Sequence, residues 1–225
     1  MPPTPTPTLT RTPAAAVPAR PRLRGRLHLV GAVVLAASGP LLWRAAETGI
    51  LRLAVMVYLV GVTTMLVTSA AYHVPAWSTT AKQRMRRADH SAIFLGVAGT
   101  YTPIVLATLG GWLEAALLGL VWTGAVAGIV VRNVFPSAPS WTRTVPYVAL
   151  GWVGVIALPW IWGHAAALAL LVLAGGVAYT LGAVVYARRR PDPWPATFGY
   201  HELFHALTLV AIALHWVAVH QAVGG

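Results

Sequence analysis

Residues 53–76 read LAVMVYLVGVTTMLVTSAAYHVPA and contain no lysine, arginine, aspartate or glutamate. A helix of about twenty apolar residues crosses the roughly 30 Å hydrocarbon core of a bilayer, so this run predicts a transmembrane helix. The whole chain has the same character, because 57% of its 225 residues are hydrophobic and 9% are charged. Soluble domains carry roughly a quarter of charged residues. The sequence therefore predicts an integral membrane protein.

Six further apolar runs accompany this one and predict an all-α bundle of seven transmembrane helices. The third and fourth runs are separated only by Gly110, Gly111 and Trp112, so hydropathy alone leaves counts of six and eight open. The distribution of basic residues favours seven. The runs lie at residues 27–43, 53–76, 91–109, 113–131, 145–162, 165–187 and 199–220.

The segments between the seven runs fall on alternate sides of the membrane if the runs cross it in turn. All but two of the sixteen lysines and arginines then lie on one side, and the exceptions are Arg44 and Arg52. The positive-inside rule places the N-terminus in the cytoplasm and, with an odd number of helices, the C-terminus outside. The net charge of +11 does not indicate nucleic-acid binding, because the basic residues form no single patch. We expect a multi-pass protein whose partner is the lipid bilayer of the cell membrane.

The first 24 residues differ from the rest of the chain. They are rich in proline and threonine and contain no apolar run, so residues 1–24 predict a disordered cytoplasmic tail rather than a signal peptide. Residues 25–225 then form one domain of seven helices. Pro103 and Pro159 lie inside apolar runs and predict kinks there.

Ionisable residues gather at one level of the expected bundle, near the cytoplasmic face. Such residues are costly inside a membrane, so each is a candidate for a functional site. His201 and His205 are four residues apart and share a helix face, so both imidazoles can reach one metal ion. The same level holds Ser69 and His73 on the second helix, Asp89 and His90 at the start of the third, and His201, Glu202 and His205 at the start of the seventh.

A metal held here must bind nitrogen or oxygen, because the chain has no cysteine. Three histidines are a known zinc ligand set that leaves one position for water, whose pKa zinc lowers to about 7. We therefore expect His73, His201 and His205 to bind zinc. Asp89 would accept a hydrogen bond from the zinc-bound water and act as general base, and Ser69 would orient water or substrate. Copper(I) is disfavoured, whereas iron and manganese remain open.

The other histidines have simpler interpretations. His28, His164 and His220 lie near helix ends and are expected at the membrane interface. His215 follows His205 by about 15 Å of helix and lies off its face, so we expect a structural role or a partner within the bundle.

The segment HELFH at residues 201–205 also matches HExxH, in which the glutamate is the base of a metalloprotease. On that interpretation Glu202 is catalytic and a third ligand of the protease type is needed. Asp192 is the nearest candidate in sequence, but it lies upstream in a proline-rich loop. His73 supplies a third ligand more naturally.

Four segments together resemble the family of hemolysin III and the progestin and adipoQ receptors, which belongs to a wider group of membrane hydrolases that includes alkaline ceramidases. The resemblance covers nearly the whole chain after the tail. The segments are RPRLRGRLH (20–28), SAAYH (69–73), RRADHSAIFLGVAGTYTPIVL (86–106) and HELFHALTLVAIALHW (201–216).

This resemblance implies a seven-helix fold with a cytoplasmic N-terminus. It implies zinc ligands at His73, His201 and His205, a zinc-bound water held by Asp89, and a role for Ser69. The resulting hypothesis is a zinc-dependent hydrolase that cleaves an amide or ester of a lipid entering from the inner leaflet. Two alternatives are a receptor-like or pore-forming, cytolytic protein in which zinc only ties helices together, and an intramembrane HExxH protease.

Overall fold

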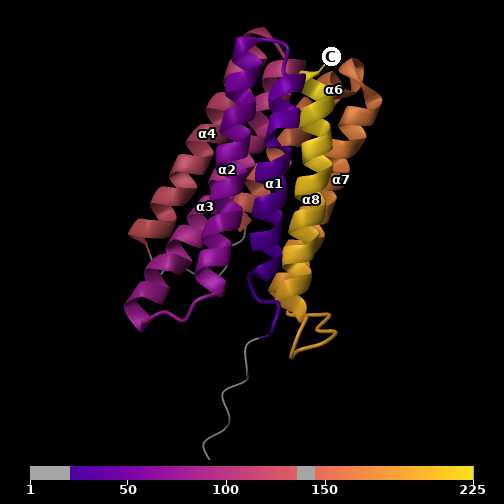
Figure 1. Cartoon of the computed structure of the whole chain (residues 1–225). Coiled ribbons are helices and arrows are strands. Elements are labelled where there is room, and N and C mark those ends of the chain that lie inside the picture. The colour runs from indigo at the N-terminus through magenta and orange to yellow at the C-terminus, as the bar shows by residue number, and fades with distance from the viewer. Residues whose placement is uncertain (1–20, 136–144, 225) are drawn as a thin grey trace, which may run out of the picture.

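The computed structural model describes residues 21–135 and 145–224, and the helices in these ranges form one elongated bundle (Figure 1). Seven spans are long and apolar enough to cross a membrane, which confirms the predicted count. They are α1 (Arg26–Ala45), α2 (Gly49–His73), α3 (Thr79–Thr108), α4 (Gly111–Val134), a composite fifth span (Val145–His164), α7 (Ala166–Arg188) and α8 (Tyr200–Val223).

Helix α3 begins at Thr79, whereas the third apolar run begins at residue 91, so the basic segment between the second and third runs is helical and not the loop that the runs imply. Lys82 and the arginines that follow it lie on the first turns of α3. The Ser78 hydroxyl caps the helix by accepting a hydrogen bond from the Ala81 amide, 3.4 Å away. Hydropathy missed these turns because they are polar, although their residue types favour a helix. Asp89 therefore lies well inside α3 and not at its start, where we expected it.

The fifth span is interrupted near the proline that predicted a kink. It consists of α5 (Val145–Trp152), a 3₁₀ segment named η2 (Val153–Ala157) and α6 (Leu158–His164). Pro159 lies in the first turn of α6, where its missing N–H needs no partner inside the helix. The Tyr101 hydroxyl from α3 donates to the Gly151 carbonyl at 2.6 Å, next to the interruption. Pro103, by contrast, lies within α3 without ending it.

Helices α2 and α3 approach closely at two glycines. A Cβ on Gly61 would lie 2.6 Å from the Leu95 carbonyl oxygen, and one on Gly99 would lie 3.0 Å from the Val57 carbonyl oxygen. Small residues allow such backbone contact in membrane bundles, where lipid tails solvate larger apolar side chains equally well. This contact holds the N-terminal half of α3 beside the end of α2 that carries His73.

The start of the described chain is bonded to the loop before α8. The Arg22 amide donates to the Ala196 carbonyl at 3.1 Å, and the Leu23 amide donates to the Thr197 carbonyl at 3.3 Å. Residues 21–24, which we assigned to the disordered tail, therefore have fixed partners. The remainder of the expected tail, residues 1–20, lies outside the described residues. Helix α1 continues from here and packs between α2 and α8 (Figure 1).

Candidate metal centre

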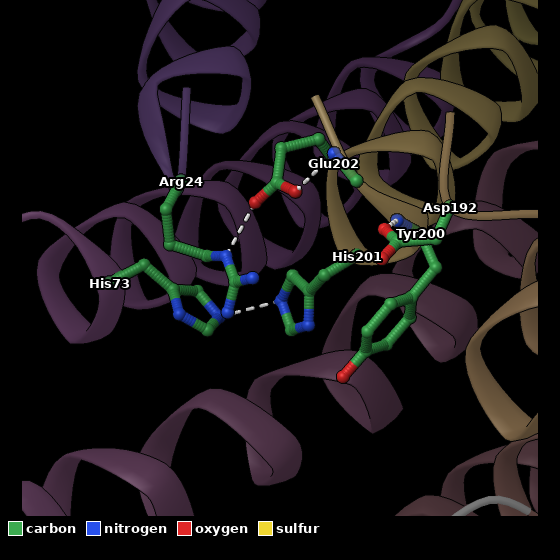
Figure 2. Close-up of polar contacts among 7 residues, drawn as sticks. Arg24, His73, Asp192, Tyr200, His201 and Glu202 are labelled. Atoms are coloured by element: carbon green, nitrogen blue, oxygen red, sulfur yellow. Dashed lines mark hydrogen bonds and ion pairs between the residues drawn. The ribbon is translucent and has the colours of Figure 1, made fainter. Parts of the chain in front are cut away.

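Three histidines from two helices converge at one end of the bundle. His73 is the last residue of α2, and His201 and His205 lie on the first two turns of α8. One ring nitrogen from each lies within 4.8 Å of the others, and the Nε2 atoms of His73 and His201 are 3.2 Å apart. Figure 2 shows these two rings directed at each other. These are the three residues that the sequence predicted as the ligands of one metal ion.

The donor set fits a tetrahedral metal ion. Two histidine nitrogens bound to zinc at about 2.0–2.1 Å lie roughly 3.4 Å apart, close to the separation of the His73 and His201 nitrogens. His201 and His205 are buried and His73 is partly buried. The three histidines could therefore hold a metal.

His28 belongs to this centre, so our assignment of it to the membrane interface was wrong. Its Nδ1 lies 2.8 Å from the Ser69 hydroxyl, and its ring stacks on His205 with centroids 3.8 Å apart and planes 4° from parallel. His28 is 4% exposed. Its position near the start of α1 suggested an interface, and only the packing of α1 against α8 reveals the stack. The polar segment RGRLH was the one sequence signal that could have pointed to it.

Asp89 lies on the third side of the centre, on α3. Its carboxyl group is buried, and it lines the same cavity as Ser69. The positive charge of Arg132, on α4, acts on the Asp89 carboxyl group. The structure thereby brings both expected catalytic residues to the histidine cluster.

Glu202 is held by contacts outside the histidine cluster (Figure 2). One carboxylate oxygen forms an ion pair with Arg24, and the other accepts a hydrogen bond from the Gly199 amide at 2.9 Å. Glu202 is 1% exposed, so this pairing satisfies a buried charge. Asp192 accepts a hydrogen bond from the Tyr200 amide at 2.8 Å and so caps the start of α8. Both acids therefore stabilise the first turn of α8.

A long cavity runs from the histidines into the bundle between α3, the fifth span, α7 and α8. Its volume is about 170 Å³, and most of its wall is apolar. The wall follows α3 from Asp89 to Val105, which corresponds to about 24 Å of helix. Residues along it include Asp89, Val97, Tyr101, Trp152, Phe204 and His215.

The remaining histidines fall into two groups, one exposed at helix ends and one lining the cavity. His164 and His220 are exposed at helix ends, where we expected them. His215 lines the far part of the cavity and bonds the Val172 carbonyl at 3.2 Å, so it has a partner within the bundle. His90 lines the cavity near Asp89.

Fold and site together define a class: a seven-helix membrane protein with a buried histidine triad that could hold a metal, placed at one end of an internal apolar cavity. A model of the family described as Haemolysin-III related matches residues 18–216. The chain therefore belongs to the haemolysin-III related family, which confirms the resemblance seen in its motifs.

Named relatives agree with this assignment. The chain is 34% identical to Hemolysin-3 of Bacillus cereus over 135 residues, which is 58% of each protein. It is 35% identical to a Hemolysin-3 homolog of Bacillus subtilis (strain 168) over 123 residues, which is 54% of each. It is 34% identical to the heptahelical transmembrane protein ADIPOR2 of Oryza sativa subsp. japonica over 188 residues, 76% of this chain and 82% of that one. The matched part thus spans little more than half the length of the two bacterial relatives.

Proposed function

We propose that this protein is a zinc-dependent hydrolase that cleaves the amide or ester bond of a membrane lipid. The observation that supports this most is the convergence of His73, His201 and His205 beside Asp89 at the end of the apolar cavity. A structural metal would need neither the cavity nor the carboxylate. Hydrolysis of a lipid needs both, because one holds the chain and the other moves protons.

His73, His201 and His205 would hold the zinc through ring nitrogens. When bound, zinc supplies Lewis acidity that activates water and polarises a carbonyl group. His28 stacks on His205 and so fixes the plane of that ligand ring. A fixed ring loses less entropy on binding a metal, as expected of groups that orient a ligand.

Asp89 and Ser69 would manage the water. Ser69, which contacts His28 and lines the cavity together with Asp89, orients the attacking water by its hydroxyl group. The Asp89 carboxylate accepts a proton as the water oxygen bonds to the carbonyl carbon. It returns this proton to the nitrogen or oxygen that leaves when the amide or ester bond breaks. Water is consumed, and a carboxylic acid with an amine or alcohol is produced.

The cavity would hold the acyl chain of the substrate. Its wall is mainly apolar and follows about 24 Å of α3, so an extended hydrocarbon chain can lie along it with its carbonyl group at the histidines. The positive-inside rule puts this end of the bundle at the cytoplasmic side. Substrate would then enter from the inner leaflet, with the N-terminus in the cytoplasm and the C-terminus outside.

The protease alternative receives less support from the contacts of its proposed base. Both carboxylate oxygens of Glu202 are engaged, one by Arg24 and one by the Gly199 amide. The receptor-like or pore-forming alternative, with zinc tying α2 to α8, differs from the hydrolase in what Asp89 does. In that case Asp89 has no reaction to serve.

Metal analysis combined with a hydrolysis assay tests the proposal. We expect His73→Ala, His201→Ala and His205→Ala each to lose most bound zinc, whereas His220→Ala, an exposed histidine, keeps it. Asp89→Ala should retain much of the zinc and lose hydrolysis of a panel of lipid amides and esters. Full zinc occupancy in the three ligand variants contradicts the site. If Asp89→Ala behaves like the parent protein in the hydrolysis assay, the alternative with a purely structural metal is favoured instead.

A further inference from the structure

A second cavity opens at the same end of the bundle, between the start of α3 and the end of α4. Gln83, Arg86 and Arg87 of α3 line it together with Arg132 of α4, and its volume is about 190 Å³. Three of these four residues are cations, and no acid lines the cavity within the described part of the chain. Guanidinium groups match phosphate oxygens in a bidentate way, so this lining suits an anion with several oxygens.

One face of α3 joins this cavity to the apolar one. Residues 83, 86, 87 and 90 follow helical spacing and lie on the same face, and His90 lines the apolar cavity. Arg132 lines the second cavity, and its positive charge also acts on Asp89. The Asn133 amide donates to the Ser91 hydroxyl at 3.0 Å and fixes the end of α4 at this level. The arginine-lined cavity therefore lies next to the part of the apolar cavity that Asp89 and His90 line.

The arginines lie where lipid headgroups are expected. Helix α3 has 30 residues and is about 45 Å long, so it exceeds a hydrocarbon core of roughly 30 Å. The part from His90 to Thr108 is about 28 Å long and nearly matches the thickness of that core. Arg86 and Arg87 then project beyond it, at the end that α3 shares with the C-terminal end of α4 (Figure 1).

We propose that this cavity binds the phosphate group of the lipid that the metal centre hydrolyses, so that the substrate is a phosphate-bearing lipid rather than a neutral one. Arg86, Arg87 and Arg132 hold the phosphate, and the acyl carbonyl, a few covalent bonds away, reaches the histidines. The acyl chain continues into the apolar cavity. The substrate class rests on the proposed function, whereas the binding of a lipid phosphate is independent of it.

The binding test uses the full-length protein in detergent micelles with three probes: a short-chain phosphatidic acid, the diacylglycerol of the same chains, and inorganic phosphate. We expect phosphatidic acid to bind at least about tenfold more tightly than either other probe, since charged hydrogen bonds and chain burial act together. Equal binding of the diacylglycerol overturns the phosphate site. Equal binding of inorganic phosphate overturns its assignment to a lipid.

Paired variants on one helix provide the control. Arg86→Gln combined with Arg87→Gln should weaken phosphatidic acid binding at least about tenfold. Lys82→Gln combined with Arg84→Gln removes the same charge from exposed positions outside the cavity and should change it less than about threefold. An equal loss in both pairs means diffuse attraction and overturns the site. A matching melting temperature shows that the variants remain folded.

Hydrolysis separates this inference from the proposed function. His73→Ala should lose zinc and still bind phosphatidic acid. Arginine-dependent binding without any lipid amide or ester hydrolysis refutes the hydrolase and leaves the phosphate site standing. Hydrolysis at equal kcat/KM for neutral and phosphate-bearing lipids, unaffected by the Arg86 and Arg87 changes, refutes the phosphate-bearing substrate and leaves the hydrolase standing.

Discussion

Replacing Glu202 tests whether this acid stabilises the fold or takes part in catalysis. Its carboxylate is 1% exposed, and the Arg24 side chain is 23% exposed. Removing one partner of a buried ion pair costs about 3–5 kcal/mol, and the partial exposure of Arg24 favours the lower end, about 3 kcal/mol. Loss of the hydrogen bond from the Gly199 amide adds about 1 kcal/mol. Glu202→Ala should therefore destabilise the protein by about 4 kcal/mol.

Glu202→Gln should destabilise the protein less than Glu202→Ala. Its amide has one oxygen, which can accept from Gly199 or from Arg24 but not from both, so one of the two contacts is lost. We expect a destabilisation of about 2 kcal/mol, in the range of one hydrogen bond to a charged group. Zinc content should stay unchanged, and lipid hydrolysis should fall only mildly.

Unfolding by titration with SDS in mixed micelles measures both free energies, and the same samples serve for metal content and hydrolysis. The matched partner is Arg24→Ala, which leaves the Glu202 charge unpaired and should cost at least as much as Glu202→Gln. The double change of Arg24 and Glu202 to alanine should cost less than the sum of the single changes, because the two side chains interact. A Glu202→Ala protein within about 1 kcal/mol of the parent refutes the stabilising role. A stable, zinc-loaded but inert Glu202→Gln protein supports the protease alternative.

Three further predictions concern Gly25 at the start of α1, His28 beside the histidine triad, and the membrane topology. Gly25→Ala should lower stability and zinc occupancy, because Gly25 has φ +77° and a Cβ there would lie 2.6 Å from the His73 Cβ; thermal unfolding and metal analysis check this. His28→Phe should keep zinc, because a phenyl ring can still stack on His205, but lower kcat by losing the bond to Ser69. Since the chain has no cysteine, Arg190→Cys should react with an impermeant thiol reagent only from the cytoplasmic side and Glu47→Cys only from outside.

Each of these predictions has a contradicting result. Gly49→Ala is the control for Gly25→Ala, because a Cβ on Gly49 would meet nothing within 4 Å, and equal effects at both positions exclude the steric explanation. An unchanged kcat in His28→Phe shows that the Ser69 contact is not needed for turnover. Labelling of both cysteines from one side is incompatible with an odd number of membrane crossings between positions 47 and 190. Labelling of each cysteine from the side opposite to the expected one inverts the proposed orientation.

Most of the candidate site could be predicted from the sequence, because helix periodicity and hydropathy give the depth of each residue. The spacing of His201 and His205 requires a shared face, and the alternation of seven spans brings His73 to the same level. Asp89 reached the site for the same reason, although the start of its helix was misplaced. Depth along the membrane is a local property of each helix and tolerates errors of a few residues.

The contacts of His28 and Arg24 could not be predicted from the sequence. Arg24 pairs with Glu202 across 178 positions of sequence, and His28 stacks on His205 across a similar separation. Nothing in the periodicity of α1 or α8 says that these two helices are neighbours. The same holds for the arginine-lined cavity, which needs the end of α4 beside the start of α3.

The sequence by itself determined the membrane class, the seven spans, the family and the level of the histidines, because these depend on helix length, apolar content and residue spacing within single segments. The tertiary structure alone decided which residues meet within that level: the stack on His205, the ion pair of Glu202, the apolar cavity and the arginines beside it. Lateral arrangement depends on close contacts between helices, at glycines such as Gly61 and Gly99, and these contacts involve residues far apart in the chain.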